Sequence, residues 1–401
     1  MTLLSQKALS IKPSPTISIT TKALELKKAG IDVISLSVGE PDFNTPANIC
    51  EAAKTAMNSG KTKYTAVDGI PELKKAIQSK FKRENELEYE PNEITVGSGA
   101  KQVIFNAFMA SINDGDEVII PAPYWVSYPE MVEMFGGKSI IVQTTQANRF
   151  KMTASDLAKA ITPKTKWIIL NSPSNPTGEV YAESELRAIA DVLIQNEHVH
   201  ILSDDIYEHL IYDPIPYKTI AQIEPKLLSR TLTINGVSKS YAMTGWRLGY
   251  GAIKNAAFIK AIANIQSQST SNPSSISQWA AVEALNGDQS FLTTSKSEFK
   301  QRRDYLCAEL SKINGIELTI PSGAFYVFFS IQKLLGRKTK SGKTLNTCFD
   351  FVEYLLEEAK IAAVHGSAFG ADGFIRFSYA ISLETLKEAV LRLQKAISDL
   401  S

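Results

Sequence analysis

The chain has 401 residues, of which 44% are hydrophobic and 21% are charged, and this composition is typical of a folded globular protein rather than a disordered or fibrous one. Its 43 Lys and Arg residues nearly balance its 42 Asp and Glu residues, so the formal net charge of +1 provides no global basic field for nucleic acid or an acidic membrane. A chain of this length is expected to form one large domain and a smaller one.

The cysteines and the first residues bear on cellular location. Cys50, Cys307 and Cys348 are too few and too widely spaced for a disulfide framework, and no two of them form a C-x-x-C pair, which favours a reducing cytoplasm. The segment from Met1 to Lys7 has no basic stretch followed by a sustained apolar one, and no run of about 18 apolar residues occurs in the chain. We therefore expect neither export nor a membrane-spanning segment.

Short runs rich in β-branched residues alternate with longer helical patterns through the middle of the chain. This alternation predicts an α/β fold with βαβ units and a mostly parallel central sheet flanked by helices. In chain order, the predicted strands span residues 93–96, 117–120, 139–143, 166–170, 200–203, 231–235 and 248–253. Between the first two strands, apolar residues from Ala100 to Phe108 recur at helical spacing and predict a helix with one buried face.

The pattern changes in the last third of the chain. Residues 267–275, rich in Ser, Thr, Asn and Pro, predict a loop, and helical segments follow to about residue 311. From residue 315 onward, predicted strands over 317–320, 325–329 and 374–377 mix with predicted helices over 347–359 and 383–398, as in an α+β unit. We expect residues 46–290 to form the large domain and residues 1–45 with 291–401 to form the small one. The basic segment 337–343 is typical of a solvated loop and is assigned no function.

Polar groups follow four of the predicted strands at their carboxyl ends. They are the Gly97-Ser98-Gly99 turn, Asn175, Asp204 and Lys239, which follow the strands over 93–96, 166–170, 200–203 and 231–235. Ligands bind at this edge of an open parallel sheet, so these groups are expected to converge on one site.

The glycine-containing turn opens the helix that begins near Ala100. Its backbone N–H groups and the positive end of the helix dipole suit a phosphate group. The turn lacks both the G-x-x-x-x-G-K-[ST] pattern of nucleotide-binding loops and the complete G-x-G-x-x-G of dinucleotide folds. It therefore indicates either a small phosphate ester or a purely structural turn.

Lys239 has a distinctive local context. It lies between Ser238 and Ser240, and Arg247 follows eight positions later among glycines. Taken with Asn175 and Asp204 at the same predicted edge, this context favours a functional lysine over one exposed lysine among many.

Ordered motifs along nearly the whole chain resemble those of class I, fold-type I aminotransferases. They are residues 38–43 (VGEPDF), 64–65 (YT), 123–125 (PYW), 171–178 (NSPSNPTG), 203–207 (SDDIY), 238–247 (SKSYAMTGWR), 321–326 (PSGAFY) and 376–378 (RFS). The resemblance implies pyridoxal 5′-phosphate as the cofactor and no metal ion. Lys239 would form the Schiff base and move the proton during catalysis.

The same resemblance implies the remaining cofactor contacts. Asp204 would pair with the pyridine N–H, Tyr207 and Asn175 would hydrogen-bond the 3-oxygen, and Trp125 would stack on the ring. The phosphate would be bound by Gly99, Ala100, Lys101, Ser238 and Arg247, with Tyr64 reaching across from a partner subunit. A homodimer with shared active sites follows from this role of Tyr64.

The resemblance also bears on the substrate. Arg376 matches the arginine that binds the substrate α-carboxylate, assisted by Asn175, the backbone at Gly39 and Trp125. Residues 266–275, where one branch of the family carries an arginine for a second carboxylate, contain none.

Lys101 and Thr16 instead resemble the pair that binds this carboxylate in the bacterial branch of aspartate aminotransferases. A lysine in the first turn of a helix opposes the helix dipole unless an anion binds there. The expected reaction is ping-pong transfer of the amino group of L-aspartate to 2-oxoglutarate, with conversion of prephenate to arogenate as a further activity.

Three alternatives remain open at this point. The first is an aromatic or alanine aminotransferase of the same fold, or a lyase-type relative. The second is a ligand-sensing regulator, which is disfavoured because the match begins near residue 10 and leaves no room for an N-terminal DNA-binding domain. The third is an inactive scaffold, which is disfavoured because the lysine, the aspartate, the tyrosine and both arginines are present.

Overall fold

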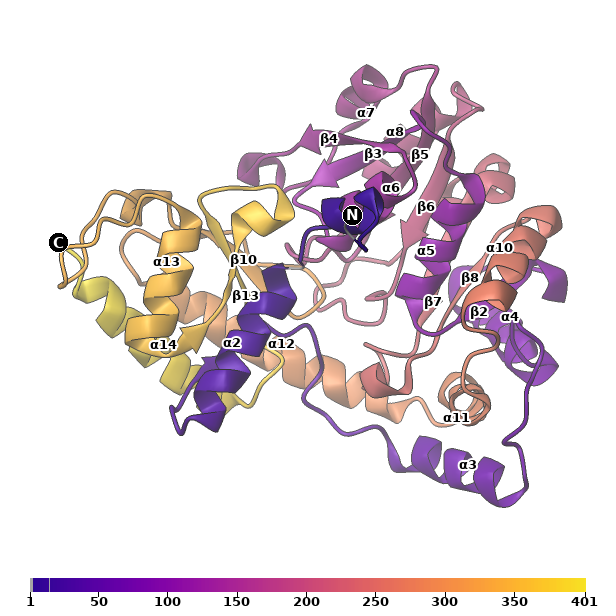
Figure 1. Ribbon diagram of the computed structural model, residues 1–401, viewed down its shortest axis with the longest axis horizontal. Helices are drawn as coiled ribbons and strands as arrows, with labels where there is room; N and C mark the ends of the chain where they lie inside the picture. The colour runs from indigo at the N-terminus through magenta and orange to yellow at the C-terminus, as the bar shows by residue number, and fades with distance from the viewer. Residues whose placement is uncertain (1–2, 14) are drawn as a thin grey trace.

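The computed structural model describes residues 3–13 and 15–401, so the sequence features at Met1, Thr2 and Ser14 lie outside the described residues. Figure 1 shows two bodies, a large one built on a central sheet and a smaller one that carries the C-terminal helices and strands. Helix α12 (Ser290–Leu310) runs between them. Within the described ranges, we find no helix of the length and apolarity that crossing a membrane requires.

The central sheet has seven strands in the order β2-β8-β7-β6-β5-β3-β4. They are β2 (Ile94–Gly97), β3 (Glu117–Ala122), β4 (Lys138–Gln143), β5 (Thr165–Asn171), β6 (His200–Asp204), β7 (Thr231–Gly236) and β8 (Gly249–Ala252). All seven predicted strands are thus present, with ends within two residues of those expected. β8 is antiparallel to β2 and to β7, and the other neighbouring pairs are parallel, which confirms the mostly parallel sheet.

Both faces of the sheet are covered, because its strands are apolar on both sides. Val118 and Ile120 of β3 pack into a core with α5 (Ala100–Ser111), α6 (Ser127–Met134) and α10 (Ala256–Ser269). Ile119 points the other way and packs against α7 (Ala154–Ala160) and α8 (Glu183–Ile194). The helix expected from residue 100 is present as α5 and begins at Ala100.

A third group of helices packs near the outer end of the sheet. It consists of α3 (Ala47–Asn58), α4 (Pro71–Asn85) and α11 (Ser275–Asn286). The loop expected over 267–275 is shorter than predicted because α10 continues to Ser269. The buried Gln266 explains this, since its side-chain amide donates to the carbonyls of Val67 and Val96 and anchors the end of the helix.

The smaller body contains a four-stranded antiparallel sheet in the order β12-β13-β10-β9. Its strands are β9 (Glu317–Leu318), β10 (Tyr326–Ser330), β12 (Val364–His365) and β13 (Phe374–Ser378). The strand predicted over 317–320 ends at Leu318, because the carbonyl of Ile320 accepts a hydrogen bond from Arg149 instead of continuing the ladder.

Helices pack on this smaller sheet. The helix predicted over 347–359 consists of α13 (Cys348–Tyr354) followed by a wider π-helical turn over Leu355–Ala359, whereas α14 (Leu383–Ser398) has the predicted bounds. Near the N-terminus, α2 (Pro15–Lys28) leads to β1 (Ile34–Ser35), which pairs with β11 (Ile361–Ala362). The segment from α2 to β1 therefore packs with the smaller body, whereas Lys12, just before it, donates a backbone hydrogen bond to Glu130 of α6 in the large body. The proposed boundaries at residues 46 and 290 stay a prediction.

Candidate active site

A cavity of about 390 Å³ opens at the carboxyl edge of the central sheet, where the smaller body meets the large one. Of the residues predicted for the site, all but Gly99 and Tyr64 line it: Thr16, Gly39, Ala100, Lys101, Trp125, Asn175, Asp204, Tyr207, Ser238, Lys239, Arg247 and Arg376. The parallel register of β5, β6 and β7 brings the ends of these strands together. Because β8 is inserted antiparallel, β2 runs in the same direction as β7 and its terminal turn reaches the same edge.

Lys239 lies in the turn that follows β7, and its Nζ donates a hydrogen bond to the carbonyl of Gly39 at 2.5 Å. Burial lowers its pKa to about 8, and the nearby cations of Arg247 and Arg376 act in the same direction, against the raising effect of Glu40 and Asp204. A larger fraction of neutral amine near neutral pH makes Lys239 a better nucleophile than an ordinary lysine.

Asp204, at the end of β6, is a buried carboxylate that faces the cavity. Burial raises its pKa to about 6, although the hydroxyl of Tyr128 donates to Oδ2 at 2.6 Å and stabilises the charged form. A cationic N–H group in the cavity would stabilise the ionised carboxylate and so offset the effect of burial on its pKa. The site thus fits a protonated pyridine nitrogen.

The opposite end of the cavity fits a phosphate. Gly99 has a φ of 93°, a conformation that favours glycine, and a Cβ atom there would lie 2.4 Å from Nη2 of Arg247. The backbone of α5 therefore begins directly beside an arginine side chain. Ser238 and Ala100 line the same region, so a hydroxyl, a guanidinium and a helix N-terminus are brought together.

Arg376, on β13, approaches the cavity from the smaller body. Its Nη1 donates to Oδ1 of Asn175 at 2.9 Å and its Nη2 donates to the carbonyl of Ser37 at 2.6 Å. The guanidinium lies over the ring of Tyr326, 4.5 Å from the centroid. Its Nε is buried and has no hydrogen-bond partner among the described residues, so the guanidinium beside the cavity has donor capacity that the protein does not use.

Lys101 places a further basic side chain in the cavity wall, in addition to Lys239, Arg247 and Arg376. Nζ of Lys101 lies 4.7 Å from the centroid of the Trp125 ring, and partial desolvation together with Arg247 lowers its pKa. Thr16, in the first turn of α2, lines the same cavity from the smaller body. Lys101 and Arg376 thus offer two separate positive groups to one ligand.

Tyr64 does not join the site within this chain. Its side chain is 93% exposed and it does not line the cavity. Gly99 is next to the guanidinium of Arg247 and does not line the cavity either. The structure therefore brings together all the predicted site residues except Tyr64 and Gly99.

Among the cavity residues that were not assigned roles from the sequence, Tyr128, Asn171 and Tyr326 make side-chain hydrogen bonds to predicted site residues. Tyr128 donates to Asp204, as described above, and its position three residues after Trp125 at the start of a helix was an available signal. The side chain of Asn171 donates to the carbonyl of Asp204 at 2.9 Å and accepts from the backbone of Asn175 at 2.8 Å. The hydroxyl of Tyr326 lies 2.8 Å from that of Tyr207.

Comparison with known proteins agrees with this geometry. Residues 31–393 match the family model described as aminotransferase class I and II. The chain is 52% identical over 401 residues, all of both chains, to the aspartate/prephenate aminotransferase of Cereibacter sphaeroides. It is similar to the crystal structure of the aspartate aminotransferase from Rhizobium meliloti, with a TM-score of 0.97 and 50% identity over all of both chains. The aspartate aminotransferase of Thermus thermophilus with maleate matches with a TM-score of 0.92 and 41% identity, covering 99% of this chain and 100% of that chain.

These findings confirm the resemblance seen in the motifs, including the fold-type I architecture. The chain therefore belongs to the class I and II aminotransferases, and its cofactor is pyridoxal phosphate.

Proposed function

We propose that this enzyme transfers the amino group of L-aspartate to 2-oxoglutarate, giving oxaloacetate and L-glutamate by a ping-pong mechanism. The observation that carries the proposal is the pair of cations in one cavity, Arg376 and Lys101, beside the buried Lys239. Two separated cations suit a substrate with two carboxylates. The relatives named for aspartate support the same substrate class.

The residues at the sheet edge would hold and tune the cofactor. Pyridoxal phosphate, when bound, supplies an electron sink for the bond broken at the substrate Cα. Asp204, oriented by Tyr128, would keep the pyridine nitrogen protonated, and Tyr207 with Asn175 would hydrogen-bond the 3-oxygen. The side chain of Trp125 would cover one face of the ring. Ser238, Arg247 and the turn over residues 99–101 would bind the phosphate.

Lys239 would act twice, first as the attachment point of the cofactor and then as the acid–base group. Once the substrate amine has taken its place, the amine of Lys239 would take the proton from the substrate Cα and deliver it to C4′ of the cofactor. Its pKa of about 8 suits this exchange near neutral pH.

Substrate orientation would come from the two cations. Arg376 would bind the α-carboxylate through its guanidinium, with Asn175 and the backbone at Gly39 nearby. Lys101 and Thr16 bind the distal carboxylate. Prephenate is proposed as a second acceptor, since one relative is named for both substrates.

Assembly and location are also proposals. The almost complete exposure of Tyr64 supports a homodimer in which this residue serves the partner's site. The free thiols of Cys50, Cys307 and Cys348 support a cytoplasmic location, where thiols stay reduced.

A panel of amino donors and 2-oxo acceptors, measured on the purified enzyme, tests the substrate proposal. We expect the highest kcat/KM for aspartate with 2-oxoglutarate, and measurable arogenate formation from prephenate with aspartate or glutamate. A clear preference for alanine, or for phenylalanine without activity on aspartate, would instead identify the alternative aminotransferase.

A further inference from the structure

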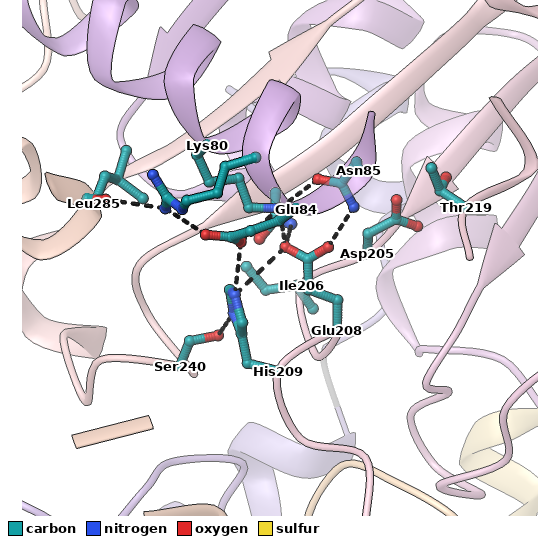
Figure 2. A network of polar contacts seen from close by, with 12 residues as sticks. Lys80, Glu84, Asn85, Asp205, Ile206, Glu208, His209, Thr219, Ser240 and Leu285 are labelled. Atoms are coloured by element: carbon teal, nitrogen blue, oxygen red, sulfur yellow. Dashed lines mark hydrogen bonds and ion pairs between the residues drawn. The ribbon is translucent and has the colours of Figure 1, made fainter. Parts of the chain in front are cut away.

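A polar network, shown in Figure 2, includes Ser240, the residue next to Lys239, and none of its members lines the cavity. It joins helix α4 to the turn after β6 and to the turn after β7. Its members are Lys80, Glu84, Asn85, Glu208, His209, Asn235 and Ser240. Apart from the half-buried Glu84 and His209, these residues are buried, and the proposed chemistry uses none of them directly.

His209, on the turn after β6, connects the other two elements, helix α4 and the turn after β7. Its Nε2 lies 2.9 Å from Oε2 of Glu84, and its Nδ1 lies 2.9 Å from Oγ of Ser240, the residue that directly follows Lys239 (Figure 2). Burial raises the pKa of Glu84, but the hydrogen bond from His209 and the charge of Lys80 outweigh it and hold the pKa at about 2. Glu84 is therefore ionised and accepts only, so Nε2 of His209 donates to it, and Nδ1 shares the second hydrogen bond with the Ser240 hydroxyl, which can donate or accept.

The second part of the network holds the helix in place. The fully buried ammonium of Lys80 contacts Oε1 of Glu208 and donates to Oδ1 of Asn85 at 2.7 Å. Asn85 also donates to Oε2 of Glu208 at 2.9 Å, and Asn235 donates to Oε1 of Glu208 at 2.6 Å. Breaking a buried pair of this kind is costly, so α4 is a rigid support for the two turns.

Two other interpretations of this cluster do not fit. Glu84, Glu208 and His209 lie close enough to share a metal ion, but Nζ of Lys80 contacts Glu208 and lies 3.4 Å from Glu84, so an ammonium already takes the place of the cation. The series Ser240, His209 and Glu84 also has the chemical order of a hydrolytic triad, but Ser240 is 1% exposed and out of reach of a substrate.

We propose that His209 is a positioning residue for Lys239, holding its turn through Ser240 with Glu84 as the fixed anchor. The inference rests on the proposed role of Lys239. Because Ser240 adjoins Lys239, restraining its hydroxyl limits the rotation of the turn and keeps Nζ directed at the cavity. Loss of this restraint should lower the rate of the chemical step more than substrate affinity, since small displacements of a reacting group are costly.

A matched pair of substitutions tests this. In His209→Asn the amide group stands at the position of Nδ1 and keeps the contact with Ser240. In His209→Gln the amide reaches the position of Nε2, so it keeps Glu84 and loses Ser240. Ser240→Ala removes the same contact from the other side. We expect the Gln and Ala variants, as holoenzymes, to lose about tenfold in kcat or more with KM for aspartate changed by less than about threefold.

The visible circular dichroism of the bound cofactor is the second measurement, because it reports how the lysine linkage is held. It should change in His209→Gln and Ser240→Ala and change less in His209→Asn, which loses the contact with Glu84 but keeps the contact with Ser240. Wild-type kcat and spectrum in the Gln and Ala variants would overturn the inference. Equal losses of kcat in the Asn and Gln variants, in proportion to the drop in melting temperature of each variant, would also overturn the inference, because they would indicate a structural role alone. If wild type itself shows no absorbance band at ~360 to 430 nm that depends on Lys239, the proposed function fails instead.

Discussion

Lys239 combines a reactive side chain with a setting that disfavours its charged form. Its Nζ is bound to the Gly39 carbonyl, and burial lowers its pKa to about 8 from 10.5 in an ordinary lysine. The order of Ser238, Lys239 and Arg247 along the sequence predicted a functional lysine. The pKa shift itself could not be predicted, because the burial that causes it and the approach of Arg376 and Glu40 arise only in the folded chain.

The cofactor-free protein should therefore be stabilised by Lys239→Met at neutral pH. The folded chain binds the Lys239 proton less tightly than the unfolded chain, so wild type loses stability at pH values below about 8, by up to about 3 kcal/mol. This cost fades as the pH rises from 8 toward 10.5. Urea unfolding of both apoproteins at pH 7 and pH 9.5 checks it. A stability difference that is the same at both pH values would contradict the account.

Lys101 is the residue on which the dicarboxylate preference depends. Lys101→Ser should raise KM for aspartate and glutamate by roughly tenfold, because a charge-assisted contact to the distal carboxylate is lost. KM for alanine and phenylalanine, which have no second carboxylate, should change much less. Steady-state kinetics with all four donors make the comparison, and equal effects on every donor would refute the role of Lys101.

The pattern of apolar residues predicted the strands and helices well, both where a strand is buried on two faces and where a helix is buried on one. The continuous apolar run of β3 and the spacing in α5 are examples. The antiparallel direction of β8 could not be predicted, because strand direction depends on the path of the loop over residues 237–248. The bond from Tyr128 to Asp204 and the network around His209 were also missed, since they join residues far apart in sequence.

The glycine before α5 is expected to be required for cofactor binding. Gly99→Ala adds a Cβ that would lie 2.4 Å from Arg247 in a backbone conformation with positive φ, so we expect weaker cofactor binding, by about tenfold or more. Gly60→Ala is the matched control, because Gly60 also has positive φ but nothing lies within 4 Å of the added carbon. Titration of both apoenzymes with pyridoxal phosphate measures the effect. Similar affinities in the two variants would argue against a phosphate site at this turn.

For the whole molecule, the two bodies contribute different parts of one site. Lys239 and Asp204 belong to the central sheet, whereas Arg376 and Thr16 approach from the smaller body. The motifs predicted these residues and their convergence. A single chain leaves Tyr64 exposed, so its proposed role requires a second chain.

Mixed dimers test this shared site. A chain with Tyr64→Ala and a chain with Lys239→Ala each lack one part of the site, and a mixed dimer contains one site with both parts intact. Random mixing should restore about a quarter of wild-type activity, because half of the dimers are mixed and each has one working site. Activity no higher than that of the separate parents would rule out the contribution of Tyr64 to the partner's site.

The most direct test of the central claim is the first half-reaction in isolation. Holoenzyme mixed with L-aspartate in the absence of any 2-oxo acid should release one oxaloacetate per active site and then stop, and later addition of 2-oxoglutarate should restart turnover. The Lys239→Ala variant should release none on the same time scale. Oxaloacetate that forms only when both substrates are present, or that forms equally fast without Lys239, would contradict a ping-pong aminotransferase built on this lysine.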